Sequence, residues 1–427
     1  MKKIIAPTIG ITFLVQLVVF LIGIGNNVII SRLLGPENLG ILAIIVVTVE
    51  IVYRLINPGM DISAIYFISN KRFEFKEYVS TYFINSIFII AVGILILFLL
   101  SQIGSITILS NEIKLNFLND LFLLIAFYFI AFLLFDFSVK IPLGLEKFSE
   151  YNKIQLFKPI ILFVLLVVST FIFTTNINEV VFFISVSFII PAFFYWRFAL
   201  PINFSWRKDP AVKSFRFGIK IMFGNLLQYL NYRADILLVS FFLTQLEVGW
   251  YYVCVIIGER LLFLTQATST ILFPSASNSE EQREKTPILS RLNFAVVFAA
   301  AFVVGISAYW LIPFLFSEQY INSVLPLIIL LPGIISLSVS KILSADFVSR
   351  GLPQYSLYVS LLNFCLNFIL NIILIPKIGI AGAALSSTFS YTAALFLQVY
   401  FYQSLTHIKL TELLLIRSGD FKKLKSI

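Results

Sequence analysis

Residues 9–30 read IGITFLVQLVVFLIGIGNNVII, an uncharged and largely apolar run that is long enough to cross a bilayer as a helix. The run follows Met1-Lys2-Lys3, as a secretory signal would, but it is too long for the apolar core of a signal sequence and no small-residue cleavage site follows it. We therefore interpret it as the first transmembrane helix. Similar runs recur along the whole chain, so this stretch predicts the class of the entire protein.

The composition of the 427 residues agrees with this interpretation. Hydrophobic residues make up 59% of the chain, charged residues only 12%, and the mean hydropathy is +0.97. Soluble domains average roughly 25% charged residues, so a water-soluble fold could not cover this much apolar surface. Inside a bilayer every backbone polar group must be paired internally, and continuous apolar runs of about 20 residues predict helices rather than a barrel.

About twelve such runs are bounded by charged residues, glycine or proline, and each is expected to form one transmembrane helix. The expected positions are 9–31, 38–60, 79–101, 118–140, 155–174, 178–199, 215–238, 247–272, 291–317, 323–346, 355–375 and 381–403. The predicted fold class is an all-α polytopic membrane protein.

The positions of Lys and Arg test this count, because cytoplasmic loops are enriched in basic residues. Loops after odd-numbered helices hold only Arg32, Lys114 and Lys377. The other loops and the C-terminal segment hold Lys71, Arg72, Lys76, Lys147, Lys153, Arg207, Lys208, Lys213, Arg216, Arg283, Lys285, Arg291, Arg417, Lys422, Lys423 and Lys425. This alternation places both termini in the cytoplasm. It also assigns most of the net charge of +9 to helix orientation and anionic lipids, and argues against nucleic-acid binding.

An internal repeat divides the predicted helices into two halves. GLEKFSEY at 144–151 aligns with GLPQYSLY at 351–358, with four identical positions at an offset of 207. Residues 27–40 align with 235–249 after a one-residue gap. The resulting offset of 209 pairs polar positions within apolar helices, namely Glu50 with Glu259, Asn57 with Gln266, and Asp61 with Thr270. Because six helices return the chain to the same side, the halves are expected to be parallel repeats.

The repeat gives the expected domain organisation. We predict an N-terminal six-helix lobe at 1–202, a cytoplasmic linker at 203–214, a C-terminal six-helix lobe at 215–403 and a basic cytoplasmic tail at 404–427.

Polar stripes run along four of the predicted helices. A charge at the centre of a transmembrane helix costs roughly 2.5 to 3.5 kcal/mol on insertion scales, so such residues should face protein or water. The stripes are Gln16, Gly23, Asn27 and Ser31; Glu50, Arg54, Asn57 and Asp61; Asn225, Gln228, Tyr232 and Asp235; and Tyr252, Glu259, Gln266 and Thr270, with Arg260 beside Glu259. We interpret them as the lining of a water-filled cavity between the halves. The alternative is that Glu50 with Arg54, and Glu259 with Arg260, form ion pairs within each half.

Other polar residues in the apolar runs are expected to be structural. Two ion pairs at short helical spacing are predicted, Asp136 with Lys140 and Lys341 with Asp346. A stripe of Asn363, Asn367 and Asn371 is predicted to form hydrogen bonds between helices.

The loops predict neither an enzyme nor a cofactor or metal site. An enzyme that joins or transfers sugars would need acids or histidines gathered in an accessible loop. The loops on the predicted external side hold scattered single acids, Glu37, Glu179, Glu247 and Glu318, and the one histidine, His407, lies in the tail. The chain has no G-x-x-x-x-G-K-S/T pattern, so direct use of ATP is not expected.

Three stretches resemble motifs of the polysaccharide-transporter family, the Wzx-type flippases. They are SRLLGPENLG at 31–40, residues 233–274, and IPKIGIAGAA at 375–384. The resemblance implies the V-shaped pair of six-helix lobes of the multidrug and polysaccharide exporter superfamily, which open alternately to cytoplasm and exterior. It also implies a flippase of the bacterial inner membrane that moves undecaprenyl-pyrophosphate-linked oligosaccharides for O-antigen, capsule or related glycans.

Partners and site residues follow from this resemblance. The implied partners are the lipid-linked oligosaccharide, membrane lipids, H⁺ or Na⁺ as a coupling ion, and other proteins of glycan assembly. Guanidinium groups suit phosphate, so the candidates for phosphate or sugar contact are Arg32, Arg54, Arg233 and Arg260, with Asn27, Asn57 and Gln266 as further substrate-binding candidates. The candidates for ion coupling or gating are Glu50, Asp235 and Glu259.

Three alternatives stay open from the sequence. A multidrug exporter of the same superfamily would favour acidic and aromatic cavity walls and commonly an acid in the first helix, which 9–31 lacks. A lipid II flippase usually carries two additional helices. A membrane polymerase or ligase of a glycan pathway is the alternative from the enzyme class.

Overall fold

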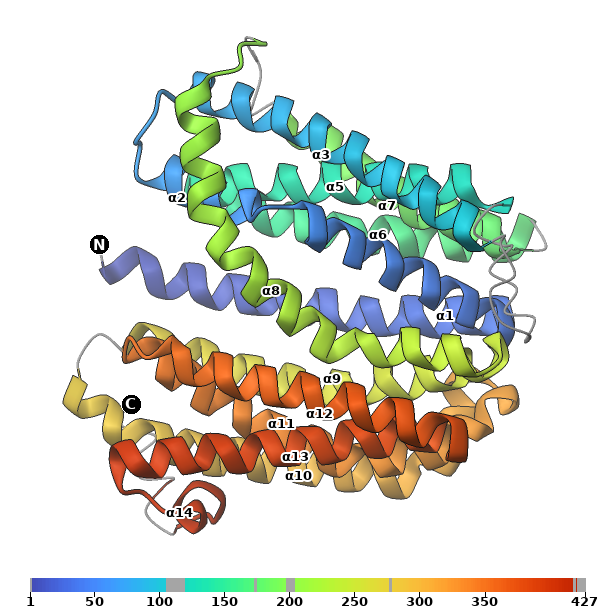
Figure 1. The fold of residues 1–427 in the computed structure, drawn as a ribbon, viewed down its shortest axis with the longest axis vertical. Coiled ribbons are helices and arrows are strands. Elements are labelled where there is room, and N and C mark those ends of the chain that lie inside the picture. Colours follow the sequence, from blue (N-terminus) through green and yellow to red (C-terminus); the bar gives the residue numbers. More distant parts are fainter. Residues whose placement is uncertain are drawn as a thin grey trace. The chain divides into compact units, whose positions relative to one another are not determined.

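The computed structural model describes residues 2–104, 120–172, 175–196, 204–275, 279–417 and 420. The elements within these ranges are helices (Figure 1). Parts of the predicted runs at 118–140, 155–174 and 178–199 lie outside the described residues, as does Lys114. The chain divides into two compact units, Met1–Leu226 and Leu227–Ile427, and the division falls inside one helix, α8. The lobe, linker and tail boundaries expected from the sequence stay predictions.

The described part of unit 1 consists mainly of apolar helices. They are α1 (Lys2–Ile56), α2 (Met60–Ser69), α3 (Phe75–Gly104), α5 (Phe122–Gly144), α6 (Phe148–Ile172), α7 (Ile177–Trp196) and the first part of α8 (Lys208–Phe242). Within this unit, α1 packs on α6, and α5 packs on α2, α3 and α7.

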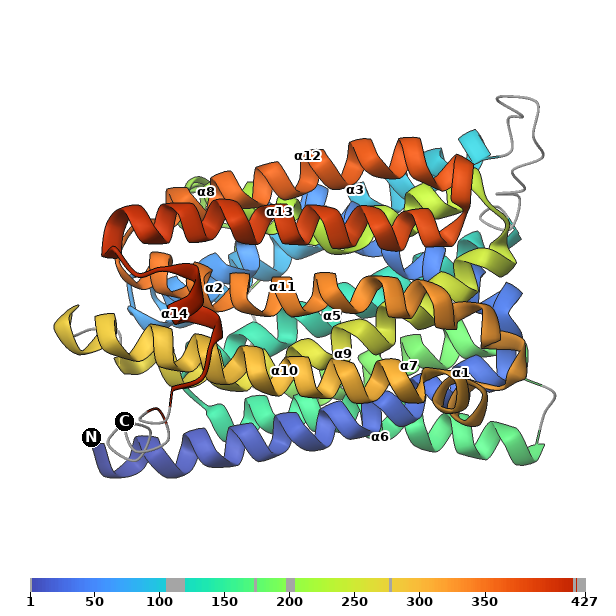
Figure 2. The ribbon, with the colours of Figure 1, turned by 90° about the horizontal axis from the view of Figure 1, so that it is seen from below.

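Unit 2 repeats this kind of packing. It holds the rest of α8, α9 (Gln245–Ser275), α10 (Ser279–Phe316), the short 3-10 helix η1 (Glu318–Ser323), α11 (Val324–Ser349), α12 (Pro353–Ile378), α13 (Ile380–Thr406) and the short α14 (Leu410–Leu414). Helices α12 and α13 run side by side, and α11 packs on α9, α10 and α13 (Figure 2).

The helix α1 contains two membrane spans. At 1.5 Å per residue its 55 residues would be about 80 Å long, far more than the roughly 30 Å of a bilayer core. The helix changes direction at Gly35, whose φ of 69° and ψ of 173° are not helical. A side chain would be strained at this φ, and Pro36 follows directly, so the predicted turn between the first two spans is confirmed.

A second break in the backbone was not expected. The sequence predicted one helix over 38–60 with a polar stripe that continues to Asp61, but α1 ends at Ile56 and α2 begins at Met60. Pro58 cannot donate a helical hydrogen bond, and Gly59 has a φ of 68°. The side-chain Oδ1 of Asn57 accepts a hydrogen bond from the Met60 backbone at 3.0 Å and starts the new helix. The stripe is therefore divided between two helices.

The protein is a multi-pass membrane protein of the predicted class. Within the described ranges, ten helices are long and apolar enough to span a bilayer, and the first of them contains the two spans of α1. The helix α8 is not among the ten, because charged residues such as Lys213, Arg216, Arg233 and Asp235 interrupt its apolar sequence. Counted with α8, the spans match the twelve that the sequence predicts.

The asparagine stripe on α12 has the predicted structural role. Asn367 donates hydrogen bonds to Ser387 at 3.1 Å and Ser390 at 3.3 Å, both on α13, and Asn371 donates to Asn367 at 2.8 Å. All three asparagines of the stripe are buried. Polar side chains thus join two helices whose apolar surfaces alone give little preference over lipid.

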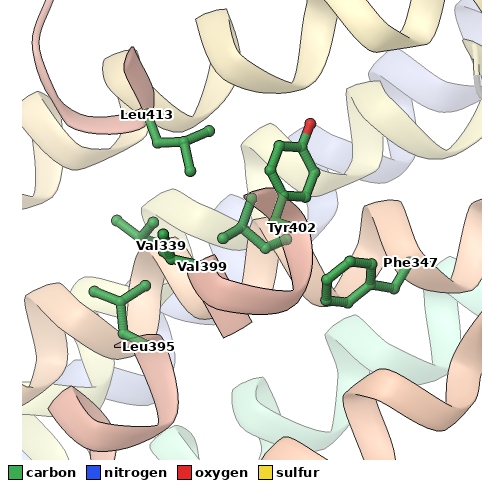
Figure 3. Packing of buried hydrophobic residues seen from close by; sticks show 7 residues of the cluster. Val339, Phe347, Leu395, Val399, Tyr402 and Leu413 are labelled. Carbon is green, nitrogen blue, oxygen red and sulfur yellow. The ribbon is translucent and has the colours of Figure 1, made fainter. Parts of the chain in front are cut away.

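The C-terminal segment folds back onto unit 2. Leu413 of α14 is fully buried in a cluster with Val339, Leu343, Phe347, Leu395, Val399 and Tyr402 of α11 and α13 (Figure 3). Arg291 of α10 was expected in a basic loop, but it is buried and binds both carboxylate oxygens of Asp420, at 2.5 and 2.8 Å. It also donates to the backbone oxygen of Glu412 at 2.6 Å. The tail is therefore part of the folded unit up to these residues.

Candidate functional site

A bidentate contact between two of the predicted site residues joins α8 to α9. Arg233 and Glu259 form two parallel hydrogen bonds, each 2.8 Å long, between guanidinium and carboxylate. Both side chains are 25% exposed. The pair is thus geometrically well formed but still accessible, and its guanidinium has the geometry that also binds phosphate.

The partner of Glu259 differs from the one that the sequence suggested. The alternative interpretation placed Glu259 in a pair with Arg260, its chain neighbour, but adjacent residues on a helix point in different directions. Arg233 of α8 pairs with Glu259 instead. It stands 26 positions earlier in the chain, which corresponds to about seven helical turns along α8 and α9. Arg260 is half-buried and makes other contacts.

A second buried contact lies close by on the same two helices. Tyr251 of α9 donates a hydrogen bond to Asp235 of α8 at 2.5 Å, and the backbone of Ile236 donates to the other carboxylate oxygen at 2.8 Å. Asp235 is buried. Both carboxylate oxygens are occupied by protein donors, which favours a structural role for this residue over ion coupling. We call Arg233, Asp235, Tyr251 and Glu259 the α8–α9 network.

A lysine of α11 also faces this region. The ammonium of Lys341 lies over the ring of Tyr232 of α8, 5.0 Å from its centre. The predicted pair of Lys341 with Asp346 is wrong, because Asp346 binds Arg350 at 2.6 Å and Thr286 at 2.8 Å. The lysine therefore adds positive charge beside the Arg233–Glu259 pair.

In unit 1 a hydrogen-bonded network joins α1, α2 and α5. Tyr53 donates to Asp136 at 2.5 Å, and Asn57 donates to the Tyr53 oxygen at 2.6 Å and to Asp61 at 3.3 Å. Lys140 lies 3.0 Å from Asp136, as predicted, and 3.8 Å from Asp61. We call these five residues the α1–α5 network. It holds two carboxylates and one ammonium, so one negative charge is not matched within it.

Tyr53 is the residue of this network that sequence reasoning missed. It stands four positions before Asn57, which is the spacing of neighbours on one helix face. A tyrosine hydroxyl at that spacing from a buried amide was the signal that could have identified it. Tyr82 of α3, whose buried hydroxyl has no hydrogen-bond partner within the described part of the chain, lies in the field of both carboxylates.

Glu50 has a different neighbour from its repeat partner Glu259. Glu50 is half-buried, and the basic residue near it is Lys158 of α6. The ammonium of Lys158 lies 3.9 Å from the centre of the Phe188 ring. The 27–40 alignment has an initial offset of 208, at which Arg233 corresponds to Gly25. At the position that corresponds to Arg233, unit 1 has no arginine, and Glu50 lies near Lys158 of α6 instead. The predicted Glu50–Arg54 pair stays a prediction.

The remaining candidates are not drawn into either network by the described contacts. Arg32 and Gln266 are exposed, Asn27 and Arg54 are half-buried, and the side chain of Thr270 lies outside the described residues. Arg32, Arg54 and Gln266 each make other contacts. The cavity expected between the halves concerns both units together and stays a prediction.

Sequence comparison identifies related proteins. The model of the polysaccharide biosynthesis protein family matches residues 29–325, more than half of the chain. A stretch of 181 residues is 26% identical to the probable low-salt glycan biosynthesis flippase Agl15 of Haloferax volcanii, covering 41% of this chain and 38% of that protein. The match therefore spans well under two thirds of this relative.

Solved structures with the same fold are membrane transporters. The lipid II flippase MurJ in an inward closed conformation has a TM-score of 0.74 at 14% identity, with 92% of this chain and 87% of that chain covered. An inward-facing multidrug resistance MATE family transporter of the MOP superfamily has a TM-score of 0.70 at 13% identity, with 91% and 94% covered. At such low identity these similarities establish the fold only.

Proposed function

The chain belongs to the polysaccharide biosynthesis protein family, and we propose that it is a flippase that moves lipid-linked oligosaccharides across a membrane by alternating access. Its fold is that of transporters, and one of its relatives is described as a probable glycan flippase. In this proposal the protein is a carrier and not an enzyme.

The observation that carries the proposal is the accessible Arg233–Glu259 pair within the membrane helices of unit 2. A bidentate pair that is 25% exposed can exchange its carboxylate for another doubly charged or bidentate anion. The pyrophosphate of a lipid-linked glycan has the matching oxygen geometry and more charge. We therefore assign Arg233 to pyrophosphate binding and Glu259 to a gate that occupies the guanidinium between transport cycles.

The finer features of the proposal rest on the sequence. The substrate would be an undecaprenyl-pyrophosphate-linked unit of O-antigen, capsule or a related surface glycan, and the membrane the bacterial inner membrane with both termini in the cytoplasm. Two six-helix lobes would alternate between inward and outward openings. Protons or Na⁺ are candidate coupling ions, and other glycan-assembly proteins are candidate partners.

Rescue of a bacterium that lacks its own surface-glycan flippase tests the proposal. The full chain is expressed in strains that differ in glycan structure, and the exported glycan is analysed by gel and mass spectrometry. We expect surface glycan to return in at least one strain. Failure in every strain, with the protein present in the membrane at the level of a functional control flippase, would contradict the proposal.

A multidrug exporter is the second candidate, because MATE transporters share the fold. Such a protein would remove ethidium from cells and raise drug resistance. The first span of α1 up to Gly35 lacks an acid, and the basic residues Arg233 and Lys341 within unit 2 disfavour cationic drugs. We expect no ethidium export in cells in which glycan export is restored.

A further inference from the structure

A cavity of about 470 Å³ lies at one end of unit 2, away from the Arg233–Glu259 pair along α9. Three segments meet there: the start of α9, the 3-10 helix η1 with the start of α11, and the turn between α12 and α13. In the proposed topology all three face the exterior. Its volume is within the range of roughly 300 to 1,000 Å³ that is typical of small-molecule sites.

Most residues that line this cavity are aliphatic, and two aromatic rings and two polar side chains join them. Trp250 and Tyr309 supply the rings, and Glu247 and Asn322 supply the polar side chains. No Lys or Arg is among its lining residues. A phosphate group would therefore meet a carboxylate and no cation, which disfavours phosphate and anionic lipid headgroups.

The carboxylate of Glu247 is held in place by a residue that does not line the cavity. Thr244 donates two hydrogen bonds to Oε2 of Glu247, at 2.8 and 3.0 Å, which leaves Oε1 toward the backbone of Gly379. A Cβ built on Gly379 would lie 3.9 Å from Oε1, and the φ of 62° at this position favours glycine. Glycine backbone thus forms the wall opposite the carboxylate.

The indole of Trp250 is also fixed. Its ring N–H donates to the backbone oxygen of Gln319 at 2.7 Å and joins α9 to η1. Tyr309 of α10 is 57% exposed and forms no hydrogen bond within the described part of the chain, so its ring can adjust to a ligand. The fixed ring of Trp250, the adjustable ring of Tyr309 and the fixed carboxylate of Glu247 thus line the same cavity.

We propose that this cavity is an exterior subsite for a neutral sugar residue of the transported glycan, which rests on the proposed function. The apolar C–H face of a pyranose packs on an aromatic ring through dispersion contacts. Sugar hydroxyls donate charge-assisted hydrogen bonds to the carboxylate of Glu247 and exchange hydrogen bonds with the amide of Asn322. The subsite holds the glycan after the pyrophosphate has left Arg233, and so favours release toward the exterior.

Saturation-transfer NMR on the purified full chain in nanodiscs tests the subsite. The probes are maltotriose and chitotriose, with inorganic phosphate and glycerophosphocholine as competitors. We expect saturation of the sugar signals by the wild-type protein, and a fall of at least about fivefold in Tyr309→Ala and in Glu247→Gln. Glutamine keeps an acceptor for Thr244, so the turn is retained.

Matched controls lie next to the cavity without lining it. Trp310 is 72% exposed and follows Tyr309, and Glu318 is an exposed acid of η1. Trp310→Ala and Glu318→Gln are expected to bind the sugars as the wild type does. Absence of sugar binding, equal losses in the controls, or displacement by either phosphate competitor would overturn the subsite.

This test separates the subsite from the proposed function, because binding is measured without transport. Sugar binding that depends on Tyr309 and Glu247, in a chain that rescues no flippase-deficient strain, would retain the subsite and reject the flippase. Rescue by a chain that binds neither sugar would retain the flippase and reject the subsite.

Discussion

At the scale of single residues, the main question is whether the Arg233–Glu259 pair binds substrate or only joins two helices. A buried ion pair is weak evidence for stability, because desolvation offsets much of the attraction. Apolar residues could join α8 to α9 at lower cost. The two roles predict different results when the positive and the negative side chain of the pair are exchanged by mutation. A structural pair needs only opposite signs on the two helices, whereas pyrophosphate binding needs a cation that the substrate can reach.

The double variant Arg233→Glu with Glu259→Arg separates these roles. We expect it to recover most of the melting temperature that each single change loses, because opposite charges still face each other. We expect glycan export to stay at least about tenfold below wild type, because the guanidinium has moved to α9. Thermal unfolding in detergent and glycan export in a rescued strain are the measurements. Recovery of both properties together would assign the pair a structural role.

Lys140 is predicted to be essential for the stability of the α1–α5 network. Lys140→Met leaves Asp61 and Asp136 without their shared cation, and we expect a loss of about 2 kcal/mol. This is less than the ~3–5 kcal/mol for a fully buried pair, because Lys140 is 19% exposed. Denaturant unfolding measures the change.

The matched control for Lys140 is Lys213, which forms an exposed pair with Asp209 at the same helical spacing. Lys213→Met is expected to change the unfolding free energy by less than about 0.5 kcal/mol. Equal losses from the two substitutions would show that Lys140 has no special role in the network.

The sequence identified which residues are polar within the membrane but not which of them touch. Glu50 and Glu259 are equivalent in the repeat, yet their basic neighbours come from α6 and α8 respectively. Helical spacing predicts neighbours on one helix, which is confirmed for Asp136 with Lys140 and wrong for Lys341 with Asp346. Partners on different helices depend on how the helices pack, which no single-chain pattern contains.

At the scale of elements, the backbone of α8 makes a close contact with the Pro58–Gly59 break within unit 1. A Cβ on Gly218 would lie 2.1 Å from the Pro58 oxygen, and one on Gly59 would lie 2.3 Å from the Gly218 oxygen. Ser63 donates across the same contact to the backbone of Ser214, at 2.9 Å. No side chain fits between these segments.

Gly218→Ala is therefore expected to destabilise the protein by about 2 to 4 kcal/mol, since backbone must move to admit a methyl group. Gly224, six residues later on α8, has no atom within 4 Å of an added Cβ. Gly224→Ala is expected to be neutral or to stabilise by up to about 1 kcal/mol through helix propensity. Melting temperature and yield of folded protein compare the two. Equal melting temperatures and yields for Gly218→Ala and Gly224→Ala would contradict the close contact.

The two breaks in the first pair of spans illustrate the reach of sequence reasoning. Gly35-Pro36 lies between the expected runs 9–31 and 38–60, so the sequence indicates the first break. Pro58-Gly59 has the same kind of signal, but it lies inside an apolar stretch that hydropathy alone continues. The polar face of Asn57 and Asp61 belongs to this break and not to a continuous helix.

The docked tail is expected to depend on pH through Asp420. The hydrogen bond from Arg291 holds the pKa of this carboxyl below its usual range, against the opposing effect of burial. The pair therefore stabilises the folded state fully above the unfolded pKa of about 3.9, and this contribution is lost as the pH falls through the lowered folded pKa. Asp420→Asn is expected to lower stability by about 3 kcal/mol at pH 7.

Melting temperature as a function of pH measures this effect. The difference between wild type and Asp420→Asn is expected to be constant above about pH 5 and to shrink below about pH 4. Glu412 and Arg417 form a more exposed pair nearby, so Glu412→Gln serves as the control and is expected to have little effect. A difference for Asp420→Asn that does not change with pH would contradict the ion pair.

At the scale of the whole molecule, each unit combines an apolar exterior suited to lipid with polar contacts in its interior. Exposed aromatic and aliphatic side chains cover the helices, while each network holds an ion pair inside its unit, Lys140 with Asp136 and Arg233 with Glu259. The sequence predicted the class, the helices and the repeat, because hydropathy and loop charge act over the whole chain. The identity of the transported molecule depends on particular contacts, and it has to be measured directly.

The most direct measurement is transport in liposomes that contain the purified chain. The probe is a polyprenyl-pyrophosphate-linked trisaccharide with a nitrobenzoxadiazole label on the sugar, and dithionite added outside destroys the label in the outer leaflet only. We predict that nearly all of the label becomes accessible with the wild-type chain, whereas about half stays protected with the exchanged Arg233→Glu, Glu259→Arg variant and with a labelled phospholipid. Protection of about half of the trisaccharide probe by the wild-type chain, as in empty liposomes, would contradict the account.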